Sequence, residues 1–281
     1  MTSAARRDPA FFDNHARETV ATSRGPCELP IFYQDASLLT AIWRVDAARA
    51  RPLVPVDFEP WLVLGKALAM LCIFEYRQTS IGPYGEIGIG VLVRKKGTKP
   101  SLLRVLGDLR KEEDQALYVI NLPVTTEEAR AAGVEIWGYP KYVRDIETRF
   151  TRDEVRAELA GEFQLTMGKG RTLRTRGLPF VTYSVDSERR LLRTVVDIDH
   201  DVQWGGAGAI DLKIIGEGPT SQTLRALGLE GKKPAFAFRT DDMRSVLPRG
   251  KNMGPASGTR ASVKAPFEST TPGRASHEAR R

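Results

Sequence analysis

Short runs of apolar residues, separated by polar or glycine-rich breaks, dominate this 281-residue chain. Three central runs are rich in β-branched and aromatic residues and are bounded by Gly, Pro or polar clusters, which is typical of strands. These runs lie at residues 66–78, 85–95 and 117–124. Residues 144–170 alternate polar and apolar side chains, as half-buried antiparallel strands do. Residues 29–46 predict two further strands, joined by a turn at the polar pair Gln34 and Asp35.

Helical patterns are few and short. Residues 125–133 predict a helix with Thr125 or Thr126 as its N-cap, acidic residues in its first turn and Gly133 at its C-terminal end. Residues 220–229 predict a second, amphipathic helix. Many strands with few helices and no βαβ alternation predict an α+β fold that is mainly antiparallel β. We expect the sheet to close on itself as a cone-like β-barrel around a buried pocket.

Composition favours one folded unit with polar ends. We expect a polar N-terminal arm at residues 1–25, a single domain at 26–250 and a disordered basic tail at 251–281. The tail holds six Lys or Arg residues and two Glu, so +4 of the net charge of +7 lies there. The body is therefore close to neutral, and its aromatic residues do not interleave with basic ones. This distribution argues against nucleic-acid binding.

Cysteine, histidine and hydropathy patterns exclude several other classes. Cys27 and Cys72 are the two cysteines, they lie far apart, and no CxxC pair occurs, which argues against a disulfide framework or a zinc site. The three histidines show no ligand spacing, so we expect no metal and interpret His200 as structural. No stretch approaches the ~20 apolar residues of a membrane-spanning helix. We expect a cytoplasmic protein without membrane contact.

Residues 133–146, GVEIWGYPKYVRDI, are the most informative segment because a lysine, Lys141, follows an aromatic–proline pair at the start of a predicted strand. A lysine amine has a reference pKa of ~10.4, so it is mostly protonated at neutral pH and is a poor nucleophile. Burial in an apolar cavity lowers the pKa of a lysine and so makes it reactive. Bulky neighbours that can exclude water are Trp137, Tyr139 and Tyr142. The alternative is an ordinary strand lysine with a solvated amine.

Two motifs resemble the acetoacetate decarboxylase superfamily. The first has the form E-x-x-G-Y/F-P-K and spans Glu135 to Lys141. The second has the form G-x-Y-x-E and spans Gly82 to Glu86. The order and separation of the flanking segments are also similar, so the resemblance covers about residues 29–249. The first motif is specific, and the others support it.

The resemblance implies Schiff-base chemistry on a small keto acid. It places Lys141 at the position of the lysine that forms an imine, and Glu86 at that of a pocket glutamate with an acid/base role. Candidate substrate-binding or pocket-wall residues are Tyr84, Trp137, Tyr139 and Tyr142. Because an iminium is itself an electron sink, no metal or organic cofactor is required. The resemblance also implies a homo-oligomer and, as the reaction, decarboxylation of a β-keto acid.

Several positions depart from the decarboxylase pattern. Tyr142 stands where decarboxylating members have a second lysine, and Leu71 and Ala36 stand where they have a second glutamate and an arginine. Glu75 and Arg44 lie close by in sequence and are candidates to replace them. Two alternatives therefore stay open. One is an aldolase-dehydratase that condenses pyruvate with an aldehyde through the same imine. The other is a barrel that binds a small carbonyl compound, or serves as an accessory protein, without catalysis.

Overall fold

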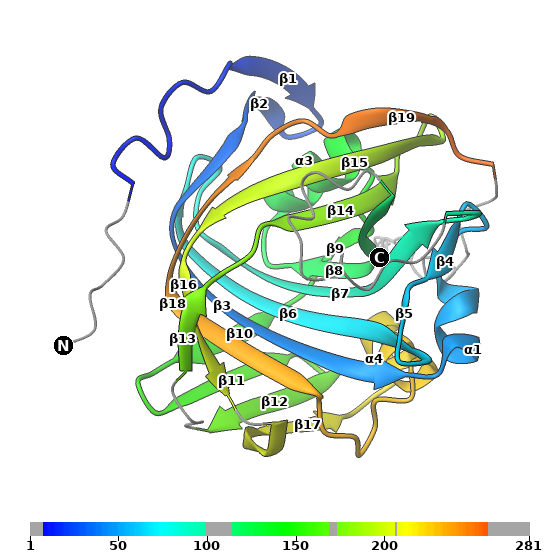
Figure 1. Cartoon of the computed structure of the whole chain (residues 1–281). Helices are drawn as coiled ribbons and strands as arrows, with labels where there is room; N and C mark the ends of the chain where they lie inside the picture. Colours follow the sequence, from blue (N-terminus) through cyan, green and yellow to red (C-terminus); the bar gives the residue numbers. More distant parts are fainter. Residues whose placement is uncertain (1–7, 99–113, 169–172, 206, 258–281) are drawn as a thin grey trace, which may run out of the picture.

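A computed structural model of the chain describes residues 8–98, 114–168, 173–205 and 207–257. Seven of its strands form a closed ring, in which β18 pairs with both β3 and β15 (Figure 1). In ring order the strands are β18 (Phe236–Leu247), β3 (Ile31–Val45), β6 (Lys66–Thr79), β7 (Tyr84–Lys95), β8 (Gln115–Val124), β14 (Phe180–Val185) and β15 (Arg190–Asp199). Every pairing in the ring is antiparallel except β8–β14, which is parallel. The predicted closed, mainly antiparallel barrel is confirmed.

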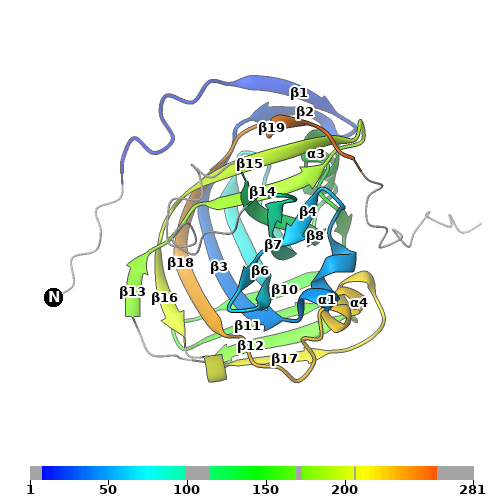
Figure 2. The same ribbon diagram turned by 45° about the vertical axis from the view of Figure 1, so that its right-hand side comes forward.

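A second, four-stranded antiparallel sheet lies against the barrel and forms the lower layer in both ribbon views (Figure 2). Its strands are β10 (Ile146–Phe150), β11 (Glu154–Leu159), β12 (Phe163–Gly168) and β17 (Ile210–Ile214). Apolar side chains of this sheet, such as Val155 and Leu165, belong to one buried cluster with Leu71 and Ile73 of the barrel strand β6. Burial of this shared apolar layer holds the two sheets together.

Shorter elements complete the fold. The remaining strands are β1 (Glu18–Thr22), β2 (Gly25–Leu29), β4 (Phe58–Pro60), β5 (Leu62–Val63), β9 (Lys141–Val143), β13 (Leu173–Arg176), β16 (Asp201–Gly205) and β19 (Lys251–Pro255). The helices are α1 (Ala47–Ala50), α3 (Glu127–Trp137) and α4 (Pro219–Ala226), with 3-10 turns η1 (Arg51–Leu53) and η3 (Ala207–Ala209). No helix in the described part of the chain is long and apolar enough to span a membrane.

The polar pair Gln34 and Asp35 is a bulge within one long strand rather than a turn between two. The register of β3 against β6 shifts on both sides of Asp35, as it does where one strand carries an extra residue. Asp35 pairs with Gln78 in the ladder, and its side chain forms an ion pair of 2.6 Å with Arg77 on β6, so this part of β3 remains joined to its neighbour strand. The predicted division of residues 29–46 into two strands was therefore wrong.

The first residues of the predicted tail are ordered. Residues Lys251–Pro255 form β19, which pairs with β15, and Met253 packs partly buried against the apolar cluster shared by the two sheets. The prediction of disorder was wrong for these residues, because they pair with β15 and Met253 packs against the core. Residues 258–281, the greater part of the predicted tail, lie outside the described residues. The division into an arm, one domain and a tail stays a prediction.

Buried His200, between β15 and β16, should make stability depend on pH. It is 3% exposed, neither ring nitrogen has a hydrogen-bond partner in the described residues, and burial lowers its pKa from 6.5 to about 4. Above pH ~6.5 the ring is neutral in both the folded and unfolded chain. Between pH ~6.5 and ~4, His200 is protonated in the unfolded chain but stays neutral in the folded chain. The free energy of unfolding therefore falls by up to ~3 kcal/mol as the pH is lowered through this range.

The His200→Asn variant isolates this effect, because other groups titrate equally in both proteins. Denaturant unfolding at pH 7, 5.5 and 4 should show that the wild type loses up to ~3 kcal/mol more than the variant as the pH falls. Equal losses in the two proteins would mean that His200 is not kept neutral by the fold.

Candidate active site

Helix α3 and strand β9 place Lys141. The helix starts after Thr126, whose side chain accepts a hydrogen bond from the backbone N–H of Ala129, as the sequence predicted for one of its two candidate caps. It continues past the predicted end at Gly133 and stops at Gly138, which adopts the left-handed conformation with φ 64°. Lys141 then begins β9, which pairs in parallel with the barrel strand β8.

Gly133 lies inside α3 because the lysine side chain needs its space. A Cβ atom at Gly133 would lie 2.3 Å from Cδ and 2.4 Å from Cε of Lys141, well inside van der Waals contact. The glycine therefore does not end the helix, as the sequence indicated, but makes room for the aliphatic stem of Lys141. Close approach of another chain segment is a common reason for glycine within a regular element.

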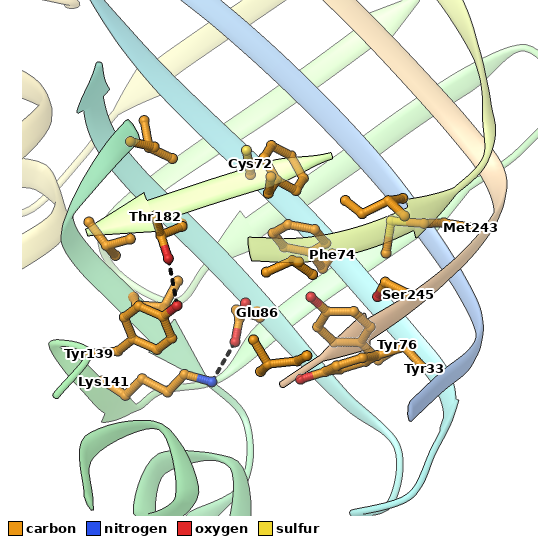
Figure 3. A pocket seen from close by; sticks show the side chains of 18 of the residues that line it. Tyr33, Cys72, Phe74, Tyr76, Glu86, Tyr139, Lys141, Thr182, Met243 and Ser245 are labelled. Carbon is orange, nitrogen blue, oxygen red and sulfur yellow. Dashed lines mark hydrogen bonds and ion pairs between the residues drawn. The ribbon is translucent and has the colours of Figure 1, made fainter. Parts of the chain in front are cut away.

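The amine of Lys141 meets Glu86 of β7 inside the barrel. Nζ of Lys141 donates a hydrogen bond of 2.7 Å to Oε2 of Glu86, and the two side chains are 6% and 9% exposed (Figure 3). The same nitrogen lies 5.5 Å from the centre of the Tyr84 ring. The two residues singled out from separate sequence motifs are thus in direct contact and shielded from water.

A pocket of about 90 Å³ surrounds this pair. Its lining is mostly apolar and comes from all seven strands of the ring and from the segment that enters β9. The apolar lining residues are Cys72, Phe74, Ile89, Leu117, Val119, Leu122, Phe180, Val196, Ile198, Met243 and Leu247, and the polar ones are Tyr33, Tyr76, Tyr139, Thr182 and Ser245. Among the described residues, the charged members of the lining are Lys141 and Glu86. A ligand here would meet one balanced ion pair and otherwise uncharged walls.

Buried tyrosines supply hydroxyl groups near the ion pair. Tyr33 and Tyr84 share a hydrogen bond of 3.0 Å, and Tyr139 shares one of 2.7 Å with Thr182. Burial raises the pKa of Tyr139 to about 12, and burial likewise raises the pKa of Tyr33 and of Tyr84. These phenols therefore stay protonated near neutral pH, so they can orient a carbonyl or carboxylate oxygen but add no charge.

Sequence reasoning missed Tyr33 and Tyr76, which line the pocket. One available signal was the spacing of Cys72, Phe74 and Tyr76 along β6, because every second residue of a strand faces the same side. No comparable local signal marks Tyr33, which reaches the pocket only because β3 and β6 are neighbours in the closed ring.

Trp137 does not line the pocket but packs against Tyr139, which does. Its indole lies nearly parallel to the ring of Tyr139, with 6.3 Å between centroids and 13° between planes. Its Nε1 donates a hydrogen bond of 2.9 Å to the carbonyl of Pro248. Tyr139 lines the pocket, and Tyr84 lies beside the lysine amine and is hydrogen-bonded to Tyr33. Their role in binding a substrate stays a prediction.

Tyr142 points away from the pocket, contrary to its expected role as a wall. Its hydroxyl shares a hydrogen bond of 2.7 Å with Thr220 of α4 and donates one of 3.2 Å to Asn121. Backbone N–H groups at the start of α4, including that of Thr220, donate to the buried carboxylate of Glu162 in the same cluster. Because neighbouring residues of a strand face opposite sides, the side chain at 142 lies away from Lys141. Because position 142 faces away from the pocket, a tyrosine in place of a second lysine changes the pocket less than the departure from the decarboxylase pattern indicated.

Glu75 and Arg44, the candidates to replace the second glutamate and the arginine of the decarboxylase pattern, lie outside the pocket. Glu75 forms an ion pair of 3.1 Å with Arg77 and faces the opposite side of β6 from Phe74. Arg44 is exposed and donates, at 3.5 Å, to the carbonyl of Leu64. Neither side chain replaces the second glutamate or the arginine of the decarboxylase pattern within this pocket. Within the described residues, no group of three or more His, Cys, Asp or Glu could hold a metal ion.

Fold and site together define a closed β-barrel protein with a buried lysine–carboxylate pair in an apolar pocket. Residues 18–176, more than half of the chain, match the family described as acetoacetate decarboxylase (ADC). The chain belongs to this family. Among proteins with curated descriptions, none matched significantly.

Solved structures with the same fold include enzymes of more than one kind. Acetoacetate decarboxylase from Legionella pneumophila aligns over 91% of this chain and 99% of its own, with a TM-score of 0.60 and 16% identity. The enduracididine biosynthesis enzyme MppR, complexed with the condensation product of pyruvate and imidazole 4-carboxaldehyde, aligns over 80% and 89%, with a TM-score of 0.55 and 16% identity. An acetoacetate decarboxylase-like enzyme from Sphingomonas wittichii RW1 aligns over 80% and 94%, with a TM-score of 0.55 and 13% identity. At such low identity these likenesses show the fold alone.

Proposed function

We propose that this protein is a lysine-dependent decarboxylase of a small β-keto acid. The observation that carries the proposal is the buried contact between Nζ of Lys141 and the carboxylate of Glu86, in a pocket with no other charged side chain among its described lining residues. The hydrogen bond gives the ammonium of Lys141 a carboxylate to which it can pass a proton, which leaves a neutral amine. The neutral amine is the nucleophile.

Proton transfer between the same two groups completes imine formation. Nζ of Lys141 bonds to the ketone carbon, and the carbonyl oxygen leaves as water after accepting one proton from the attacking amine and the one held by Glu86. The products are a positively charged iminium, a water molecule and the carboxylate of Glu86, so charge is conserved. The carbon–carbon bond to the substrate carboxylate then breaks, its electron pair moves towards the iminium nitrogen, and CO2 leaves behind a neutral enamine. Protonation and hydrolysis release the ketone.

Uncharged walls favour decarboxylation over pyruvate condensation. A bound keto acid brings one negative charge for which the described lining offers no further cation, and an unpaired buried charge is costly. Loss of CO2 converts the substrate carboxylate and the iminium into a neutral enamine, so the pocket then holds one charge, that of Glu86, instead of three, and the cost of burying charge falls. In a pyruvate aldol reaction the carboxylate stays throughout and would need a lasting counter-ion. The aldolase-dehydratase reading is therefore the second candidate.

Borohydride trapping tests the proposal. Incubation with acetoacetate followed by borohydride should give a covalent adduct in the intact mass spectrum, located by peptide mapping at Lys141, and untrapped samples should release CO2. Trapping with pyruvate, together with consumption of an added aldehyde and no CO2 release, would instead support the aldolase-dehydratase. Absence of an adduct with either acid would favour a non-catalytic barrel. Homo-oligomeric assembly and a cytoplasmic location stay predictions.

A further inference from the structure

We propose that the preferred substrates are 3-oxo acids with an uncharged alkyl group beyond the ketone, rather than acetoacetate or 3-oxo diacids. This inference rests on the proposed function and names the substrate class of the same pocket. Its basis is the wall that surrounds the ion pair, where eleven lining side chains are apolar. Four of these, Leu117, Phe180, Val196 and Ile198, are only half-buried.

Charge balance excludes a second carboxylate. Lys141 and Glu86 neutralise each other, and the described lining has no arginine, histidine or further lysine. The carboxylate next to the reacting carbon is removed as CO2, but one at the far end of a diacid would remain unpaired among apolar side chains. Such a charge loses its hydration without gaining a partner. The far end of the substrate must therefore be uncharged.

Apolar walls also give a longer alkyl chain an advantage over the methyl group of acetoacetate. The pocket measures about 90 Å³, whereas one water needs only about 10–15 Å³ by the same measure, so there is room beyond the ketone. Burial of two more methylenes should raise kcat/KM about fifteenfold. The half-buried side chains of Phe180 and Val196, which are partners across β14 and β15, provide contacts for this part of the chain.

A matched set of substrates tests the inference. Acetoacetate is the reference, 3-oxohexanoate adds two methylenes, and 3-oxohexanedioate has the same six-carbon chain with a second carboxylate. Release of CO2 should show kcat/KM about fifteenfold higher for 3-oxohexanoate than for acetoacetate, and at least about a hundredfold lower for the diacid than for 3-oxohexanoate.

Binding of the two corresponding ketone products separates this inference from the proposed reaction. Decarboxylation would convert 3-oxohexanoate to 2-pentanone and 3-oxohexanedioate to 4-oxopentanoate. These two products differ by the same terminal carboxylate as the two substrates, and their binding can be measured whether or not the protein catalyses a reaction. Calorimetric titration should show tighter binding of 2-pentanone. Equal or tighter binding of 4-oxopentanoate would overturn the inference, whether or not acetoacetate is decarboxylated. Conversely, preferred binding of 2-pentanone without adduct or CO2 would support the pocket's selectivity and reject the reaction.

A positive charge can be introduced into the wall at Val196. Because this residue is only half-buried, we expect the variant to fold. Val196→Arg should place a cation near the far end of the substrate and raise the ratio of 4-oxopentanoate to 2-pentanone affinity at least about tenfold. Val196→Thr, similar in shape and uncharged, is the matched control and should keep the wild-type preference. An unchanged ratio in a folded Val196→Arg protein would count against an uncharged wall as the cause of selectivity.

Discussion

Replacing Lys141 with methionine should abolish the borohydride-trapped adduct and lower the rate of CO2 release by at least about a thousandfold, because removal of a covalent nucleophile is among the most damaging changes in an active site. Methionine resembles the aliphatic stem of lysine and keeps the contact with Gly133. Lys141 is the one lysine among the described lining residues, so no other amine is placed to substitute. The measurements are intact mass after borohydride and kcat with acetoacetate.

Stability must be separated from chemistry in this variant. Removing one partner of a buried ion pair costs about 3–5 kcal/mol, because Glu86 is then left without its counter-charge. The double variant Lys141→Met/Glu86→Gln has no such charge and should regain part of the lost free energy of unfolding. Both proteins should be equally inactive although their stabilities differ. If either released CO2 at more than a few per cent of the wild-type rate, the imine mechanism would be wrong.

Gly133→Ala should have the second-largest effect, a fall in kcat/KM of about a hundredfold, through displacement of the lysine stem. The added Cβ would lie 2.3 Å from Cδ of Lys141, so either the side chain or α3 must move by an ångström or more. A shift of about 1 Å in a reacting group costs on the order of a hundredfold in rate. Intrinsic helix propensity alone favours alanine by about 1 kcal/mol, so any loss of function would run against the local preference.

Gly168→Ala is the matched control for this substitution. A Cβ at Gly168 would meet nothing within 4 Å, and the residue is exposed. Its kcat/KM should therefore stay within about twofold of the wild type, and circular dichroism should show that both variants fold. Wild-type activity in Gly133→Ala would show that the lysine stem is not confined by α3.

Much of the barrel, and the identity of the two residues that form the central ion pair, could be predicted from the sequence. The runs that became β6, β7 and β8 are strand-like in composition, and strands in such numbers without βαβ alternation favour a sheet closed on itself. Lys141 and Glu86 came from two short motifs more than fifty residues apart, and the structure brings them to 2.7 Å. Their catalytic roles stay predictions, because contact and burial do not by themselves measure reactivity.

The parts that sequence reasoning missed depend on neighbours distant in the chain. Gly133 was taken for a helix end because glycine usually marks one, and only the path of Lys141 explains it within the helix. Asp35 was taken for a turn residue because its partner, Arg77, lies on another strand. Tyr142 is different, since strand alternation alone shows that it cannot share the face of Lys141.

The confined lysine stem has an energetic consequence for substrate encounter. A solvent-exposed lysine samples many rotamers, and fixing them costs about 1.5–2 kcal/mol of conformational entropy. Here the space at Gly133 and the apolar wall fix the conformation of the Lys141 side chain when the protein folds, so this entropy is lost on folding and not on ligand binding. The amine can meet a carbonyl carbon without first being ordered, an advantage of roughly tenfold or more in rate over the same lysine on a mobile surface loop.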